Sequence, residues 1–174
     1  CLGVPAVHRV EIHNDEGLMA AEFSNFKVLN LHARSGSRWS NLTEDEYAAR
    51  CEQRASCYRM VSEWVEDWTS RNSLSKVPVL LAGDFNADLD RPRDFPELQA
   101  LPEGFTDALP GAATETWKNP LRYRLKPKQR KHDRYDAVWV KHARVLHARI
   151  VGDEPSVRDM CPSDHYGVLH ARIV

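Results

Sequence analysis

A carboxylate and a carboxamide two residues apart are the side chains in this sequence most able to do chemistry. The apolar run at residues 77–82 stops at Gly83-Asp84-Phe85-Asn86. In extended geometry Asp84 and Asn86 face the same way, beyond the end of the expected strand. The carboxylate could orient or deprotonate a water while the amide donates to a phosphoryl oxygen. The alternative is an Asx turn that only closes the strand, for which this sequence is equally suited.

A second polar group, Ser163-Asp164-His165, precedes an apolar-rich run at residues 166–174. Adjacent residues of an extended chain face opposite ways, so Asp164 and His165 are poor partners for each other. Asp136 is the better partner for His165, because a carboxylate at a neighbouring strand end could accept from the imidazole and fix its tautomer. The alternative is that Asp136 caps its strand and His165 is an exposed loop residue.

His32 ends an expected strand at Asn30-Leu31-His32. If this strand and the strand before Asp84 run in the same direction, His32 and Asp84 lie at one edge of the sheet. A single histidine at a strand end more often has a structural role, so this residue alone identifies no site.

A local cluster of basic residues runs from Lys118 to Arg134, mostly within a segment, residues 110–132, that has no helical or strand period. Such a cluster, with Trp117 and Tyr123 nearby, could hold a phosphate backbone or stack a base. A solvated basic loop is the alternative. The cluster consists of Lys118, Arg122, Arg124, Lys126, Lys128, Arg130, Lys131 and Arg134.

The composition indicates an ordinary soluble domain, and its net charge gives no overall electrostatic attraction to nucleic acid or to a membrane. The chain has 174 residues, 42% of them hydrophobic, and a formal net charge of −1. This length suffices for one core, and no apolar run approaches a membrane span. The sequence begins without methionine, so we expect a fragment, a processed product or a trimmed chain. The four cysteines are spaced for neither a zinc site nor a disulfide scaffold, which favours reduced core thiols: Cys1, Cys51, Cys57 and Cys161.

The periodicity of the apolar residues predicts an α/β layered domain with a mixed sheet. A capping-box signature at Thr43 and Glu46 begins a long amphipathic helix that ends near Arg71. A shorter helix is expected at residues 95–101. The expected strands are residues 4–12 and 19–32, which form a hairpin, and residues 77–82, 135–140, 145–151 and 167–174.

Taken in order, these groups resemble the endonuclease/exonuclease/phosphatase superfamily. This superfamily includes deoxyribonuclease I, abasic-site endonucleases, neutral sphingomyelinases, inositol-polyphosphate 5-phosphatases and tyrosyl-DNA phosphodiesterase 2. The resemblance spans residues 29–174 and implies a four-layer α/β sandwich of the deoxyribonuclease I-like type, of which residues 1–174 would be the C-terminal part. It rests on Asn30-Leu31-His32, Gly83-Asp84-Phe85-Asn86, Thr116-Trp117, Arg134-Tyr135-Asp136 and Ser163-Asp164-His165.

The resemblance also implies roles for these residues. Asp84 would position the attacking water, Asn86 would steady the phosphate and His32 would bind it. His165, paired with Asp136, would act as base or as transition-state donor, and the sequence leaves open whether Asp84 or His165 takes the proton. Asp164 would lie near a Mg²⁺ ion, with Mn²⁺ as the alternative metal. Independently of the resemblance, the basic cluster predicts that Arg122, Arg124, Lys126 and Lys128 would hold the substrate.

The sequence departs from the superfamily pattern at its N-terminal end. The Asn and the metal-binding Glu that members place upstream have no match before Leu29, and the neighbours of Glu11 and Glu22 do not fit that motif. We therefore expect a second polypeptide, the N-terminal half of the same domain, to cover residues 4–32 and 77–82.

The function predicted from these observations is a Mg²⁺-dependent phosphodiesterase, with nucleic acid as the favoured substrate. Within the superfamily, the later motifs look most like the tyrosyl-DNA phosphodiesterase branch, although the Gly-Asp-Phe-Asn spelling fits it less well. The alternatives are a sphingomyelinase-like or small-molecule phosphatase, and a non-catalytic binding module that lacks the metal-binding Glu. A purely structural domain is disfavoured, because no packing requirement accounts for Asp84, Asn86, Asp136 and His165 together.

Overall fold

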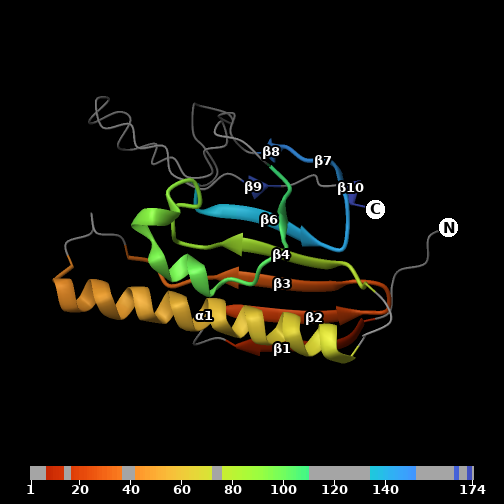
Figure 1. Ribbon diagram of the computed structural model, residues 1–174, viewed down its shortest axis with the longest axis horizontal. Helices are drawn as coiled ribbons and strands as arrows, with labels where there is room; N and C mark the ends of the chain where they lie inside the picture. Colours follow the sequence, from red (N-terminus) through yellow and green to blue (C-terminus); the bar gives the residue numbers. More distant parts are fainter. Residues whose placement is uncertain are drawn as a thin grey trace, which may run out of the picture.

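The computed structural model describes residues 7–13, 17–36, 42–71, 76–109, 134–151, 167–168 and 172–173. Its main element is a six-stranded mixed sheet with the strand order β1-β2-β3-β4-β6-β5 (Figure 1). These strands are β1 (Val7–His13), β2 (Leu18–Phe23), β3 (Lys27–His32), β4 (Val79–Asp84), β5 (Thr106–Asp107) and β6 (Asp136–Lys141). Two small antiparallel pairs join β7 (Val145–His147) to β10 (Arg172–Ile173) and β8 (Ile150–Val151) to β9 (Gly167–Val168). An α/β fold is therefore confirmed.

The sheet is antiparallel except between β3 and β4, which run parallel. Parallel neighbours need a long crossover connection, and helix α1 (Glu44–Arg71) provides it. The helix begins as predicted: the Glu46 backbone N–H donates to Thr43 Oγ1 at 3.2 Å, and the Thr43 N–H donates to Glu46 Oε2 at 2.8 Å. In the described part of the chain, no helix is both long and apolar enough to cross a membrane.

Three expected elements were wrong in detail. The single strand expected over residues 145–151 is two strands, β7 and β8, which belong to different two-stranded sheets. The single strand expected over residues 19–32 is two strands, because the chain turns between Phe23 and Phe26, whose rings stack 4.4 Å apart. The helix expected over residues 95–101 is a short 3-10 turn, η2 (Pro96–Ala100), which a second such turn, η1 (Pro92–Asp94), precedes. Proline is tolerated in the first turn of a helix and breaks its interior, so the second proline starts a new turn.

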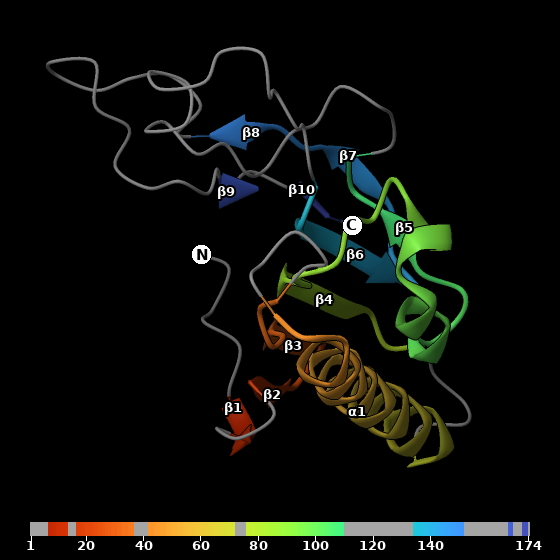
Figure 2. The ribbon, with the colours of Figure 1, turned by 90° about the vertical axis from the view of Figure 1, so that its left-hand side faces the viewer.

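The core lies between α1 and one face of the sheet. Figure 2 shows α1 and the green 3-10 turns on the same side of the strands. Cys57, a fully buried and reduced thiol as predicted, is part of this core, whereas Cys51 is half-buried. Leu81 of β4 is fully buried toward the helix, but its neighbours Leu80 and Ala82 are only half-buried. One face of this strand is therefore fully buried, and the other is partly buried.

The other face of the sheet exposes apolar side chains on its first two strands. The exposed fractions are 51% for Val10, 65% for Ile12 and 38% for Met19. Ile12 and Met19 are cross-strand partners, so they form a continuous apolar surface. Such a surface commonly marks a contact with another protein segment.

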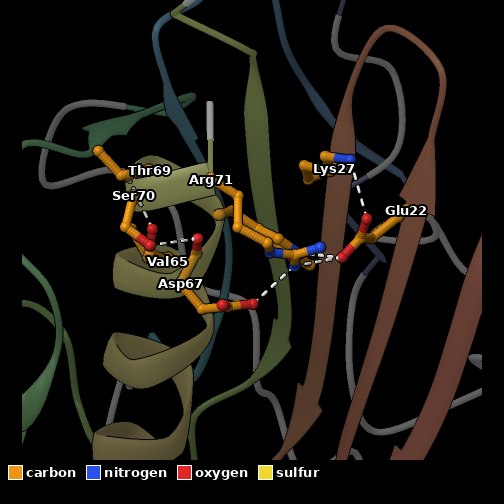
Figure 3. A network of polar contacts seen from close by, with 8 residues as sticks. Glu22, Lys27, Val65, Asp67, Thr69, Ser70 and Arg71 are labelled. Carbon is orange, nitrogen blue, oxygen red and sulfur yellow. Dashed lines mark hydrogen bonds and ion pairs between the residues drawn. The ribbon is translucent and has the colours of Figure 1, made fainter. Parts of the chain in front are cut away.

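A charged network attaches the C-terminal end of α1 to β2 (Figure 3). The nearly buried Glu22 carboxylate accepts hydrogen bonds from Arg71 Nη2 at 2.7 Å and Lys27 Nζ at 3.2 Å. Trp68 Nε1 is a third donor to it, at 2.5 Å. Burial alone would raise the pKa of the Glu22 carboxyl, but these donors outweigh that effect and lower the pKa from 4.5 to about 2.

We expect Glu22→Gln to lower the free energy of unfolding at pH 7 by about 2 kcal/mol. Because the folded-state pKa lies below the unfolded value, the carboxylate stabilises the fold fully above pH 4.5, and this contribution is lost as the pH falls toward 2. Urea denaturation between pH 7 and pH 2 would measure the difference, with the exposed Glu63→Gln as control. A constant difference across this pH range would contradict the assignment.

Candidate functional site

Three of the predicted site residues lie in one row at the end of the sheet. The parallel register pairs His32 of β3 with Asp84 of β4, and the antiparallel register pairs Asp84 with Asp136 of β6. His32 Nε2 lies 3.8 Å from Asp84 Oδ2, and the two form an ion pair when the imidazole is protonated. The expectation that His32 and Asp84 share one edge is confirmed. The His32 side chain is 76% exposed, whereas that of Asp84 is 15% exposed.

Gly83 makes this close pairing of β3 and β4 possible. Its φ is +134°, and a Cβ atom added there would lie 1.9 Å from the Leu31 carbonyl oxygen. Any other residue would push the two strands apart at the position just before Asp84. The glycine of the Gly-Asp-x-Asn sequence is therefore required by the packing of the site strands.

Asp84 and Asn86 contact each other through a turn and not through extended chain geometry. Asn86 has a φ of +49°, so the chain leaves the strand in a left-handed conformation that Asn tolerates. The Asn86 backbone N–H donates to Asp84 Oδ1 at 2.8 Å, which is the Asx turn considered from the sequence. Asn86 Nδ2 donates to Asp84 Oδ2 at 2.9 Å and to the Ala33 carbonyl at 2.8 Å. The turn fixes the orientation of the carboxylate and ties it to β3.

A tyrosine of α1 stabilises this turn by a hydrogen bond from the core. Tyr58 is fully buried, and its hydroxyl donates to the carbonyl of Phe85 at 2.5 Å. The Phe85 ring, also fully buried, packs against the rings of Tyr58 and Trp139 with centroid distances of 6.3 and 5.0 Å. Burial raises the pKa of the Tyr58 hydroxyl, so it stays a donor. The residue between Asp84 and Asn86 therefore has both its backbone and its side chain fixed.

A buried charged group attaches the segment after this turn to the start of β6. Asp88, 1% exposed, accepts from the backbone N–H of Asp90 at 3.1 Å and pairs with the Arg91 guanidinium. Arg134 is buried as well, and its Nη1 lies 2.5 Å from Asp107 Oδ2. Arg134 was counted with the basic cluster from the sequence, but its charge is neutralised inside the fold. Its contacts fix where β6 begins, and hence where Asp136 lies.

The remaining predicted site residues lie outside the described residues. Their roles stay predictions, as do the pairing of Asp136 with His165 and the assignment of residues 1–174 to a single domain. These residues are Arg122, Arg124, Lys126, Lys128, Asp164 and His165.

The described side chains do not by themselves make a magnesium site. Among them, no group of three or more His, Cys, Asp or Glu residues is placed to hold a metal ion. Both oxygens of Asp84 already accept hydrogen bonds from Asn86. Because Mg²⁺ needs oxygen ligands in near-octahedral arrangement, the described residues alone do not fit the ion.

Solved structures show what this arrangement of strands resembles. The chain superimposes on truncated TDP2 from Caenorhabditis elegans with a TM-score of 0.60 and 17% identity, over 92% of this chain and 63% of that one. It matches the 3' phosphatase NExo from Neisseria, bound to a product DNA hairpin, with a TM-score of 0.60 and 18% identity, over 93% and 69% of the two chains. A mannosyl-6-phosphatase from Bacteroides thetaiotaomicron gives a TM-score of 0.59 and 20% identity, over 90% of this chain and 56% of that one.

The chain has a deoxyribonuclease I-like fold. It spans less than two thirds of the truncated TDP2 chain and about half of the mannosyl-6-phosphatase chain. No protein-family model and no curated protein matches its sequence. The deoxyribonuclease I-like fold predicted from the sequence is thus confirmed. Sequence identities of 17 to 20% do not assign a functional role to any residue of this chain.

Tyr58 and Asp88 support the site, and sequence reasoning assigned them no role. Tyr58 lies on the apolar side of the predicted helix, but its hydroxyl donates to a carbonyl 27 residues away, which no local pattern reveals. For Asp88 a signal was present, because Asp84, Asn86 and Asp88 recur at every second position after the strand.

We expect Tyr58→Phe to lower the free energy of unfolding by about 1 to 2 kcal/mol, because it leaves the buried Phe85 carbonyl without its donor. Urea denaturation would measure this, and hydrogen exchange at Asn86 should accelerate because the turn loses one of its supports. Tyr47→Phe, a half-buried tyrosine on the same helix, is the control. Equal losses of unfolding free energy in the two variants would contradict a stabilising contribution from the hydrogen bond to Phe85.

Proposed function

We propose that this chain is the C-terminal part of a phosphodiesterase domain that hydrolyses phosphate ester bonds, with nucleic acid as the favoured substrate. The observation that carries the proposal is the row formed by His32, Asp84 and Asp136, with Asn86 bonded to Asp84. The deoxyribonuclease I-like fold supports it, since the similar structures include a 3' phosphatase and a mannosyl-6-phosphatase.

The chemistry proposed for the row follows from exposure and orientation. The exposed His32 imidazole, which lies 3.8 Å from Asp84 Oδ2, would when protonated donate to a phosphate oxygen. The Asp84 carboxylate, held by Asn86, would orient or deprotonate the attacking water. Asp136 would orient His165, which would act as base or as transition-state donor.

The proposal keeps Mg²⁺, or Mn²⁺, as the cofactor that the resemblance implies. A bound divalent ion would supply charge neutralisation at the phosphate. Because the described side chains do not complete such a site, its ligands would come from Asp164 and from residues beyond this chain.

We also propose that the N-terminal half of the domain covers the exposed apolar face as a separate polypeptide. Two observations support this: the exposure of Val10, Ile12 and Met19, and the greater length of the similar structures. The nucleic-acid substrate is supported by the basic residues Arg122, Arg124, Lys126 and Lys128.

We expect Asp84→Asn to reduce Mg²⁺-dependent hydrolysis of a single-stranded oligonucleotide by at least about 100-fold, because the amide cannot accept a proton from water. Hydrolysis would be followed for the 174-residue chain alone and with any polypeptide that co-purifies with it. The control is Asp94→Asn, an exposed aspartate on η1. EDTA should abolish activity in the wild type and in the control.

The same assay separates the alternatives. Unchanged hydrolysis in Asp84→Asn would contradict the proposed role of the row. Hydrolysis of sphingomyelin or of a sugar phosphate in preference to the oligonucleotide would favour the sphingomyelinase-like or small-molecule phosphatase alternative. Oligonucleotide binding without hydrolysis, in every combination of polypeptides, would favour the non-catalytic binding module.

A further inference from the structure

The strand geometry of β3 continues past its last assigned residue and carries a cation beyond His32. Leu29, Leu31 and Ala33 are buried, whereas Asn30, His32 and Arg34 are exposed. The Ala33 backbone N–H still donates to the Asp84 carbonyl, at 2.9 Å, so the pairing with β4 extends one residue further. The alternation places Arg34 next after His32 among the exposed side chains of this strand.

The backbone that carries Arg34 is held by a buried ion pair. Arg54 of α1 is fully buried, and its Nη1 donates to the carbonyls of Arg34 at 3.2 Å and Gly36 at 2.8 Å. Its Nε donates to Glu97 of η2 at 2.7 Å. A buried pair of this kind contributes little net stability, because desolvation offsets its attraction. What it does here is fix the loop after His32 before any ligand arrives.

The Arg34 guanidinium itself is available to a ligand. Within the part of the chain that the structure describes, it makes no ion pair with a carboxylate. Two other exposed arginines are paired, Arg59 with Glu52 at 2.5 Å and Arg71 with Glu22 at 2.7 Å, whereas Arg93 and Arg144, like Arg34, form no ion pair within the described residues. An exposed arginine beside an acidic row provides the positive charge that an anionic substrate needs there.

We propose that Arg34 binds a second phosphate of the substrate, adjacent to the phosphate at His32. Alternate residues of a strand are about 6.6 Å apart, which is comparable with the separation of consecutive phosphates in an extended single strand. The substrate class selected by this position is a nucleic acid strand with consecutive phosphates, in preference to an isolated phosphate ester. This inference rests on the proposed function, because it uses His32 as the site of the scissile phosphate.

Two thymidine ligands test the position directly. Thymidylyl-thymidine has one phosphate, and the trinucleotide without terminal phosphates has two. Binding would be measured by NMR titration of the isotope-labelled chain, which reaches weak affinities and needs no catalysis. We expect the wild type to bind the trinucleotide about tenfold more tightly than the dinucleotide, which corresponds to one charge-assisted arginine contact.

Arg34→Gln should remove most of this preference and leave dinucleotide binding unchanged. Arg59→Gln, which removes an exposed arginine from α1, should keep the preference and is the matched control. The inference is overturned if Arg34→Gln still prefers the trinucleotide tenfold, or if the wild type shows no preference.

Hydrolysis measured in the same samples with Mg²⁺ separates this inference from the proposed function. Loss of the preference in Arg34→Gln without cleavage of either ligand, alone or with co-purifying polypeptides, supports the phosphate contact and counts against the hydrolase. Cleavage of both ligands with an unchanged preference in Arg34→Gln supports the hydrolase and rejects the contact.

Discussion

The parallel pairing of β3 with β4 is the constraint on which the rest of the site depends. It sets the register that places His32 beside Asp84, and it is possible only because Gly83 lets the strands approach without a side chain between them. A shift by one residue would turn every side chain of β4 to the opposite face of the sheet. The site would then lose its carboxylate to the core, and Leu81 would leave the core.

Helix α1 fixes both loops that follow these two strands. Arg54 and Tyr58 lie four residues apart, so they are on the same side of the helix, one turn from each other. Arg54 binds the carbonyls after β3, and Tyr58 binds the carbonyl after β4. The crossover helix that a parallel pair needs is thereby also the element that sets the backbone on which the candidate site is built.

The two faces of the sheet differ, and the difference bears on function. One face is closed by α1 and η2, whereas the other leaves apolar residues of β1 and β2 exposed. The candidate site lies at the end of the strands, in a row that reaches from β3 to β6. The core beneath α1 therefore holds these strands in place, while the site itself lies outside that core. One fold can carry different substrates, and in our proposal Arg34 beside the row would contribute to the choice among them.

The sequence by itself determined the elements and the residue types able to do chemistry. The capping box placed the start of α1 within one residue, and polar residues at the ends of apolar runs predicted His32, Asp84, Asn86 and Asp136 as candidate site residues. The apolar pattern failed at residues 24–26 and 148–149, where the chain leaves the strand, and at residues 92–96, where two prolines interrupt the helix. Local sequence carries these signals because periodicity, capping and chain breaks act within a few residues.

Only the tertiary structure decided which of these residues meet. The direction of β3 relative to β4, the burial of Arg134 and Arg54, and the hydrogen bond from Tyr58 to Phe85 all join residues distant in sequence. Arginine and tyrosine look the same in a sequence whether their polar atoms are in water or inside a network. The two cases differ in free energy: burying these polar atoms costs desolvation, and the hydrogen bonds and ion pairs that they gain offset this cost. Those partners come together only once the chain is folded.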